Sequence, residues 1–177
     1  NNGKKFSVGV SINNLSLNEN DIGEFKTFLK ISPPLRTEDD RLALVQGIKE
    51  DLIDVIVSDH LPEDEESKRL PFAQAATGAI GIETLLPLAL EMYHNDSLPL
   101  NKIIETITIN PSKILKINKG SLRKGSDGDL CIFDLEKPWK LDAENLKSKS
   151  KNTAIEDRRL QGKVLMTFLN GELVFNN

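Results

Sequence analysis

Residues 54–60 read Asp-Val-Ile-Val-Ser-Asp-His, and this stretch decides the fold class of the chain. Four residues here, Ile53, Val55, Ile56 and Val57, are apolar and β-branched, which is typical of a strand buried on both faces in a parallel sheet. In α/β folds, ligands and catalytic groups lie just beyond the carboxyl ends of such strands. The polar triplet Ser58-Asp59-His60 follows these residues directly. Asp59 and His60 therefore suit a metal or proton-transfer site, and they equally suit a strand that ends in an N-cap and a turn.

Composition excludes several classes of protein. The 177 residues are 38% hydrophobic, so we expect a globular chain with its own core. The net charge of −4 comes from interspersed charges, so neither nucleic acid nor a membrane surface is an expected partner. No apolar run approaches the roughly 20 residues of a membrane span. The single cysteine, Cys131, lies in an apolar run, which predicts a buried, unpaired thiol in a reducing, cytoplasmic environment.

Strand and helix signals alternate around the central stretch. Alternation at 6–12 predicts a first strand, and the polar residues 13–21 predict a loop. Thr37 and Asp40 have the spacing of a capping box, so a helix should begin at Thr37 and end near residue 50. Its apolar stripe should comprise Leu42, Leu44, Val45 and Ile48. A helix joined by a short link to the strand at 53–57 is the repeat unit of α/β folds.

The segment after the central stretch is a long charged loop at 61–76. It is either a solvated face or an active-site lid. Further helices are expected at 82–93, 100–108 and 110–115. Asn110 should be the N-cap of the last one, because a proline follows it.

The last part of the chain has the patterns of β structure. Strands are expected at 129–135 and 139–141. The alternating runs 164–169 and 172–175 flank Asn170-Gly171, which is the strongest short-range signal for a hairpin. We therefore divide the chain into an α/β part, residues 1–118, and a small β part, residues 119–177. Two or three strands do not form a stable parallel sheet alone, so the first part should be the end of a barrel or open sheet that begins elsewhere.

Four stretches carry a resemblance that runs, in order, along most of the chain. They are Lys-Ile-Ser-Pro-Pro-Leu-Arg at 30–36, Ser-Asp-His-Leu-Pro at 58–62, Pro-Phe with Gly-Ile-Glu-Thr within 71–84, and Asn-Pro-Ser-Lys-Ile-Leu at 110–115 with the glycines and Asp-Leu that follow. Together they resemble the amidohydrolase superfamily and, within it, the dihydroorotases. The last stretch is shared by many cyclic amidohydrolases, whereas the first two point to dihydroorotase. The charged loop looks closest to an alphaproteobacterial branch.

The resemblance implies a fold and an activity. The fold is the C-terminal portion of a TIM-like (β/α)8 metal-dependent hydrolase barrel, with part of a small C-terminal β-sandwich. The activity is the reversible conversion of N-carbamoyl-L-aspartate to L-dihydroorotate in pyrimidine biosynthesis. A barrel needs ~250 residues, so we expect the 177 residues alone to be an inactive fragment of an active parent enzyme.

The resemblance also implies roles for individual residues. Asp59 matches the aspartate that binds one zinc and acts as general base and acid at the attacking water and the ring nitrogen. Ser32 falls at a substrate-binding asparagine, and Thr77 and Gly78 fall where loop backbone meets the pyrimidine ring. Glu63 replaces a histidine that binds the substrate carboxylate. Its negative charge would repel that substrate unless the side chain turns away.

Other departures from the family leave alternatives open. Asn13-Asn14 replaces a His-His pair, and the remaining zinc ligands have no counterpart here, so we expect them upstream of residue 1. Ser32 and Glu63 motivate a second interpretation, a non-catalytic homologue that serves as structural partner of aspartate transcarbamoylase. A hydantoinase or allantoinase is a third. For an enzyme, the expected partners are its small-molecule substrate and either a second copy or aspartate transcarbamoylase.

Overall fold

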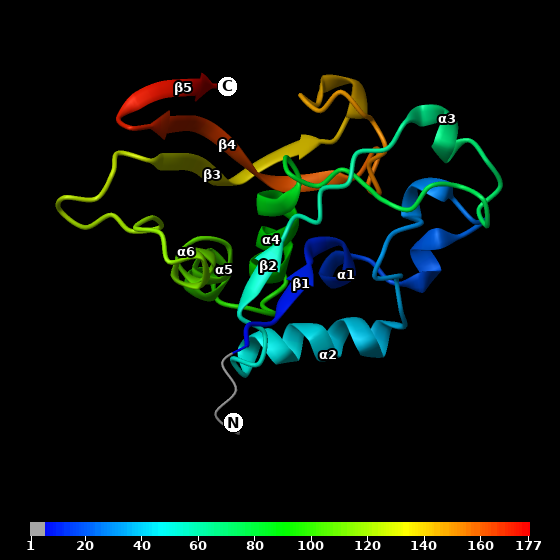
Figure 1. The fold of residues 1–177 in the computed structure, drawn as a ribbon, viewed down its shortest axis with the longest axis horizontal. Helices are drawn as coiled ribbons and strands as arrows, with labels where there is room; N and C mark the ends of the chain where they lie inside the picture. The colour runs from blue at the N-terminus through cyan, green and yellow to red at the C-terminus, as the bar shows by residue number, and fades with distance from the viewer. Residues whose placement is uncertain (1–5) are drawn as a thin grey trace.

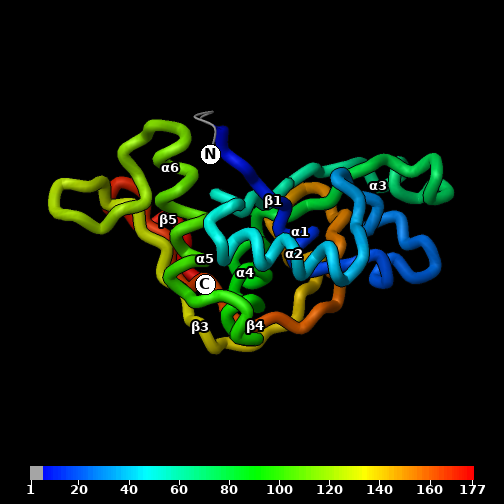
Figure 2. Tube along the Cα trace, turned by 90° about the horizontal axis from the view of Figure 1, so that it is seen from below, coloured from blue at the N-terminus to red at the C-terminus, as the bar shows by residue number. Residues whose placement is uncertain are grey.

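The computed structural model describes residues 6–177, and its first part is built on two parallel strands. Strand β1 (Gly9–Ser11) pairs with β2 (Val55–Val57) so that Ser11 lies opposite Val57. Parallel neighbours need a long crossover, and helix α2 (Glu38–Lys49) supplies it. This helix lies along one side of the strand pair in Figures 1 and 2. The crossover also contains α1 (Ile12–Ser16), η1 (Glu19–Ile22) and η2 (Thr27–Leu29).

Four helices follow β2 before the chain enters its last part. They are α3 (Glu65–Lys68), α4 (Leu85–His94), α5 (Leu100–Ile107) and α6 (Ile109–Leu115). Helix α4 lies between the strand pair and the C-terminal sheet (Figure 1). Its Leu88, Ala89 and Leu90 are fully buried, because both sides of this helix are covered. No helix within residues 6–177 is both long enough and apolar enough to cross a membrane.

The last part is an antiparallel sheet with the strand order β3-β4-β5. Its strands are β3 (Leu130–Lys140), β4 (Arg159–Leu169) and β5 (Glu172–Asn176), with η3 (Ala143–Asn145) between the first two. The hairpin predicted at Asn170-Gly171 is confirmed. Both residues have positive φ, 52° and 81°, as a two-residue hairpin turn of type I′ requires. The strands expected at 129–135 and 139–141 are one strand, β3, interrupted by an irregularity between Asp134 and Pro138.

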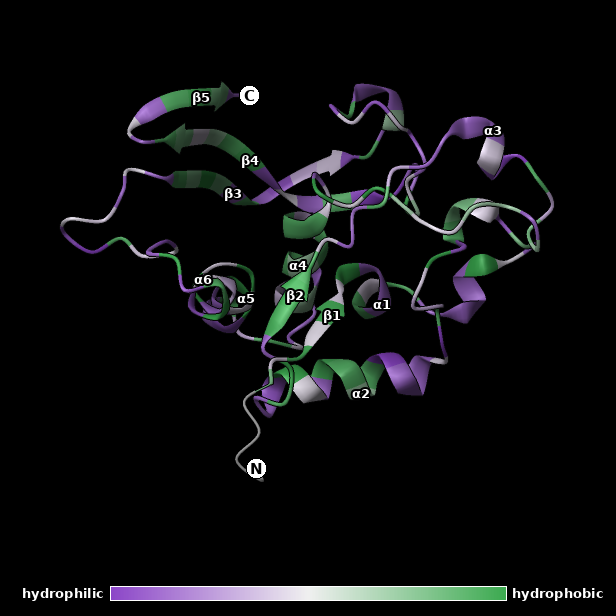
Figure 3. Ribbon diagram, in the orientation of Figure 1, coloured by the Kyte–Doolittle hydropathy of each residue, from purple (hydrophilic) through white to green (hydrophobic). Residues whose placement is uncertain are grey.

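One hydrophobic core joins the two predicted parts of the chain. Half of its buried members come from the strand pair and from α1, α2, α4 and α5, and Figure 3 shows β2 as hydrophobic along its length. Leu141, Ile155 and Leu160 from the last part belong to the same core. Gly162 in β4 lies so close to α4 that an added Cβ would come within 2.4 Å of Leu90 Cδ1. The division into 1–118 and 119–177 stays a prediction, and buried contacts cross it.

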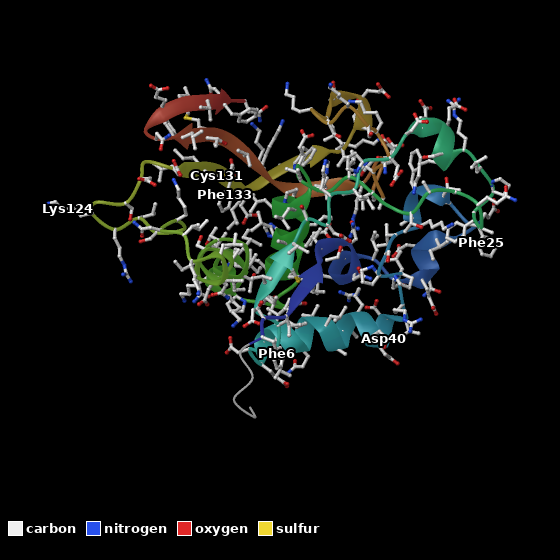
Figure 4. The ribbon with its side chains drawn as sticks, viewed as in Figure 1. Phe6, Phe25, Asp40, Lys124, Cys131 and Phe133 are labelled. Carbon is white, nitrogen blue, oxygen red and sulfur yellow. The ribbon has the colours of Figure 1, made fainter. Side chains whose placement is uncertain are left out.

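Several expectations about burial were wrong. Ile56 is buried, but Val57 is 44% exposed, because β2 has only one neighbouring strand among residues 6–177. Leu42, placed in the apolar stripe of α2, is 48% exposed, whereas Val45 and Ile48 are buried. Cys131 is exposed, not buried, because it lies on a sheet whose strands β3 and β5 are mostly solvent-accessible. Figure 4 labels Cys131 on β3.

Some element boundaries also differ from the expected ones, for local reasons. Strand β1 is shorter than the run 6–12. Helix α1 begins at the last residue of that run and continues into the expected loop, because the Ser11 side chain accepts a hydrogen bond from Asn13 N and caps the helix. Asn110 is not an N-cap. It lies within α6, and its side chain donates instead to the Asp54 carbonyl at 2.8 Å, which ties α6 to the start of β2.

The capping box of α2 is confirmed and gives a test of local stability. Asp40 N donates to Thr37 Oγ1 at 3.2 Å, and Thr37 N donates to Asp40 Oδ2 at 3.3 Å. Asp40 is labelled on α2 in Figure 4. We expect Thr37→Ala to lower the free energy of unfolding by about 1 kcal/mol, because the first turn loses its acceptor. Urea unfolding measures this change. Thr37→Ser keeps the hydroxyl and should stay close to wild type, and equal losses in both variants would contradict the capping role.

Candidate functional site at the carboxyl end of the parallel strands

The carboxyl ends of β1 and β2 lie side by side, since Ser11 is opposite Val57 in the ladder. Asn13 and Asn14 therefore follow β1 at the same edge at which Asp59 and His60 follow β2. Parallel strands place their carboxyl ends together, and this edge is where α/β proteins bind ligands. The residues 58–60, which the sequence predicts to be functional, thus lie where the carboxyl ends of two parallel strands come together.

Asp59 stands at the point where the chain turns away from β2. Its φ is +49°, in the left-handed region that aspartate tolerates better than most residues, and its side chain is partly exposed. The next residue, His60, forms a parallel bridge with Ala79, and His60 Nδ1 accepts a hydrogen bond from Gly81 N at 3.0 Å. Segment 58–61 is therefore held against segment 78–81, which fixes the backbone on the C-terminal side of Asp59.

Gly78 is packed where two of these segments meet. Its φ is +151°, and an added Cβ would lie 2.8 Å from Leu61 side-chain atoms and 2.9 Å from Leu61 O, so a side chain does not fit. Gly78 N donates to Lys30 O at 2.9 Å. That bond brings the loop of Thr77 and Gly78 next to the segment that leads to Ser32, which is exposed. Three of the predicted substrate residues therefore belong to adjoining segments.

Glu63 joins the same group through its backbone. Glu63 N donates to Asn152 Oδ1 at 3.3 Å, and Asn152 Nδ2 donates to Leu61 O and to Gly78 O, each at 3.2 Å. Asn152 is 2% exposed. Sequence reasoning missed it, because it stands in a polar, basic stretch that has the composition of an ordinary surface loop.

Lys68 is a second residue that sequence reasoning missed. It belongs to the charged run that was interpreted as a solvated face or a lid, yet it is 1% exposed. Its ammonium donates to Gly78 O at 2.8 Å, to Ala76 O at 2.9 Å and to Lys30 O at 3.4 Å. Burial lowers the pKa of Lys68, and the negative charge of Glu63 opposes that shift. The neighbouring Arg69 shows the expected exposed behaviour and pairs with Glu65.

The asparagine pair after β1 is buried. Asn14 Nδ2 donates to Pro34 O at 3.1 Å and to Pro33 O at 3.4 Å, so Asn14 anchors the proline-rich segment that follows Ser32. Asn13 Nδ2 and Asn14 Oδ1 are buried and have no hydrogen-bond partner among residues 6–177. The sequence singled out this pair only as a departure from the family, and its anchoring role was not predicted.

The fit of these residues to a metal ion is partial. A partly exposed carboxylate at the end of a parallel strand suits Asp59 as one ligand. Within the described part of the chain, however, no three His, Cys, Asp or Glu side chains come together as a metal site. Two surface cavities of about 550 and 1030 Å³ lie elsewhere, one beside η2 and residues 153–158 and one beside α5 and α6. Neither is lined by Asp59 or the predicted substrate residues.

A parallel strand pair joined by a helical crossover is typical of α/β proteins, and polar side chains at its carboxyl end lie where barrels and open sheets bind their ligands. The model of the amidohydrolase family matches residues 10–174, and the chain belongs to that family.

Relatives with known names refine the comparison. The chain is 42% identical over 175 residues to the dihydroorotase of Ehrlichia canis and 39% identical over 175 residues to that of Aquifex aeolicus. Among solved structures, the L-hydantoinase of Arthrobacter aurescens superposes with a TM-score of 0.91 over 96% of this chain at 28% identity. The resemblance to the dihydroorotases is confirmed. The chain spans 39% of the length of the Ehrlichia relative and 39% of the hydantoinase chain.

Proposed function

We propose that this chain is the C-terminal part of a dihydroorotase, a metal-dependent cyclic amidohydrolase that interconverts N-carbamoyl-L-aspartate and L-dihydroorotate. The observation that carries the proposal is the 42% identity to a dihydroorotase over 99% of the chain, which includes the segments around Ser32 and Asp59. In this proposal β1 and β2 are the last two strands of a (β/α)8 barrel. The sheet β3-β4-β5 is part of a small β-sandwich.

The proposed role of Asp59 follows from its place at the strand end. A zinc ion bound there would lower the pKa of water towards ~7 and polarise the substrate carbonyl. Asp59 would contribute one oxygen ligand, and as general base and acid it would take a proton from the attacking water and return it to the ring nitrogen. The remaining ligands would have to come from residues other than those described here.

The proposed substrate contacts come from the loops beside Asp59. Ser32 offers a hydroxyl from its exposed position. The loop of Thr77 and Gly78 would meet the substrate ring through the backbone of Thr77, because the N–H and the carbonyl of Gly78 are already hydrogen-bonded within the protein. Glu63 stands where a carboxylate of the substrate would be bound. Its negative charge acts on the buried Lys68, where it opposes the lowering of the lysine pKa by burial.

Two alternatives remain, and each has an observation behind it. The structural likeness to the Arthrobacter L-hydantoinase supports a hydantoin substrate. Ser32 and Glu63 support a non-catalytic role as a structural partner of aspartate transcarbamoylase or within a homodimer. For the enzyme we expect a cytoplasmic location, because an exposed single thiol such as Cys131 persists in a reducing compartment.

The deciding experiment uses the protein as its own cell makes it. Its intact mass is compared with the 19.7 kDa of this chain, and the purified protein is assayed with N-carbamoyl-L-aspartate and with hydantoin. The proposal expects a larger mass and ring closure of N-carbamoyl-L-aspartate. Hydrolysis of hydantoin alone would establish the first alternative. Inactivity towards both, together with a stable complex with aspartate transcarbamoylase, would establish the second.

Metal binding by the isolated chain gives a separate prediction. Structural and catalytic zinc sites use three or four protein ligands, and Asp59 alone is a weak site. We expect the 177-residue chain to retain clearly less than about one zinc per molecule after dialysis. Elemental analysis by mass spectrometry measures this, with Asp59→Ala as the matched variant. One tightly held zinc in the wild-type chain would overturn the expectation.

A further inference from the structure

Lys68 is a buried cation that forms no salt bridge in the described part of the chain, although the negative charge of Glu63 acts on it. A buried lysine usually pairs with Asp or Glu. The ammonium of Lys68 instead donates three hydrogen bonds, to the backbone carbonyls of Lys30, Ala76 and Gly78. Removing a charged side chain from water is expensive, and lysine is rarely fully buried. An apolar side chain at position 68 would fill the same space without that penalty. What a lysine adds there is its hydrogen bonds to the three carbonyls.

Asn152 approaches the same loop from a distant part of the chain. It lies 74 residues after Gly78, and it uses both ends of its amide: Nδ2 donates to Gly78 O and Leu61 O, and Oδ1 accepts from Glu63 N. The Gly78 carbonyl therefore accepts from both Lys68 and Asn152, which satisfies its two lone pairs. We call Lys68 and Asn152 the carbonyl clamp.

The contacts of the clamp fix consecutive peptide groups around Thr77 and Gly78. The carbonyl of Ala76 is bound by Lys68, the amide N–H of Gly78 is bound by Lys30 O, and the carbonyl of Gly78 is bound by both members of the clamp. With three successive peptide planes held, little freedom is left in the backbone direction at Thr77. The clamp also reaches the segments of Ser32 and Glu63, through Lys30 O and Glu63 N.

We propose that Lys68 and Asn152 are positioning residues that set the geometry of the substrate-binding loops at Ser32, Glu63, Thr77 and Gly78. The inference rests on the proposed function for the identity of those loops. The clamp itself touches no proposed substrate atom. It acts through the backbone, by holding three chain segments in one arrangement before the substrate arrives, so that little binding energy is spent on ordering them.

The test uses the intact protein with Lys68→Met, which keeps the length of the side chain and removes the ammonium. We expect kcat/KM for N-carbamoyl-L-aspartate to fall by about 10²-fold, mostly through KM, because a misplaced binding loop weakens the productive complex. Gly78 N–H should also lose its protection from hydrogen exchange at a temperature where the protein remains folded. Asn152→Ala, which leaves the ammonium in place, should change KM and the exchange at Gly78 and Glu63 in the same direction.

Two controls separate positioning from a general loss of stability. Lys124→Met makes the same change at an exposed loop residue far from β2 (Figure 4) and should behave like wild type. Leu98→Ala removes a buried side chain, 2% exposed, and should lower the melting temperature while KM stays unchanged. The proposal is overturned if folded Lys68→Met and Asn152→Ala resemble Leu98→Ala, with lower stability but normal KM and normal exchange at Gly78.

Failure of the proposed function gives a different result from failure of the clamp. If the intact wild-type protein does not turn over N-carbamoyl-L-aspartate, the dihydroorotase assignment is wrong, and hydrogen exchange at Gly78 and Glu63 still decides whether the clamp orders these loops. If Lys68→Met does not fold, Asn152→Ala provides the same kinetic and exchange measurements. Unchanged exchange in folded Asn152→Ala then contradicts the clamp.

Discussion

Replacing Asp59 with alanine in the intact protein is expected to lower kcat for ring closure and ring opening by about 10⁴-fold, or below detection. The variant would lose the group that moves the proton and one ligand of the zinc ion together. Steady-state kinetics in both directions measures the effect, and zinc analysis of the same sample shows how much metal is lost. Turnover close to that of wild type would refute the role assigned to Asp59.

The backbone at Asp59 makes a second variant informative. Its φ of +49° is tolerated by asparagine as well as by aspartate, whereas alanine there is strained. Asp59→Asn therefore keeps the local conformation and removes the negative charge. We expect it to lose activity as fully as Asp59→Ala does, with a smaller loss of stability. Asp64→Ala, an exposed carboxylate whose side chain does not cap α3, is the matched control and should remain active.

Gly81→Ala is expected to have the largest effect on folding. A Cβ at this position would lie 2.3 Å from Ser58 O, a backbone atom that cannot turn aside. The segment 78–81 would have to move away from the end of β2, so we expect the free energy of unfolding to fall by about 3 kcal/mol. Activity should fall with it, because the same movement displaces Asp59. Urea unfolding at neutral pH measures the stability.

Gly47→Ala is the matched control for this substitution. An alanine Cβ at Gly47, within α2, would meet the end of the Ile53 side chain at 3.1 Å, and that side chain is able to shift. Alanine also favours the helix interior by roughly 0.5–1 kcal/mol over glycine. The two contributions oppose each other, so we expect little net change. A loss in Gly81→Ala no larger than that in Gly47→Ala would show that the close approach to Ser58 does not constrain the fold.

The features that were predictable from the sequence are those with a local physical cause. The capping box at Thr37 and the hairpin at Asn170-Gly171 depend on residues a few positions apart, and the structure shows both. The strand end after β2 was predictable because β-branched residues followed by polar ones mark the end of a strand, whereas a function for this edge stays a prediction. Exposure at Val57 and Cys131 was not predictable, since burial depends on which surfaces the rest of the fold covers.

The candidate site was only partly predictable, for a related reason. Motif matching indicated the residues that would face a ligand, Asp59 and Gly78 among them. The residues that hold those loops, Lys68 and Asn152, lie in charged or polar stretches that have the composition of solvated loops. Their burial depends in part on contacts with residues far away in the chain, 38 residues from Lys68 to Lys30 and 91 residues from Asn152 to Leu61, which no local pattern encodes.

The contact of Asn152 with Gly78 sets an order of events during synthesis. Protein chains are made from the amino terminus, and their domains begin to fold before the chain is finished. When the strand pair and α2 have left the ribosome, the residue that completes the hydrogen bonds of the Gly78 carbonyl is still 74 residues downstream of it. In the nascent chain, the hydrogen bonds of the loop at 77–78 therefore stay incomplete until the part that contains Asn152 has been translated.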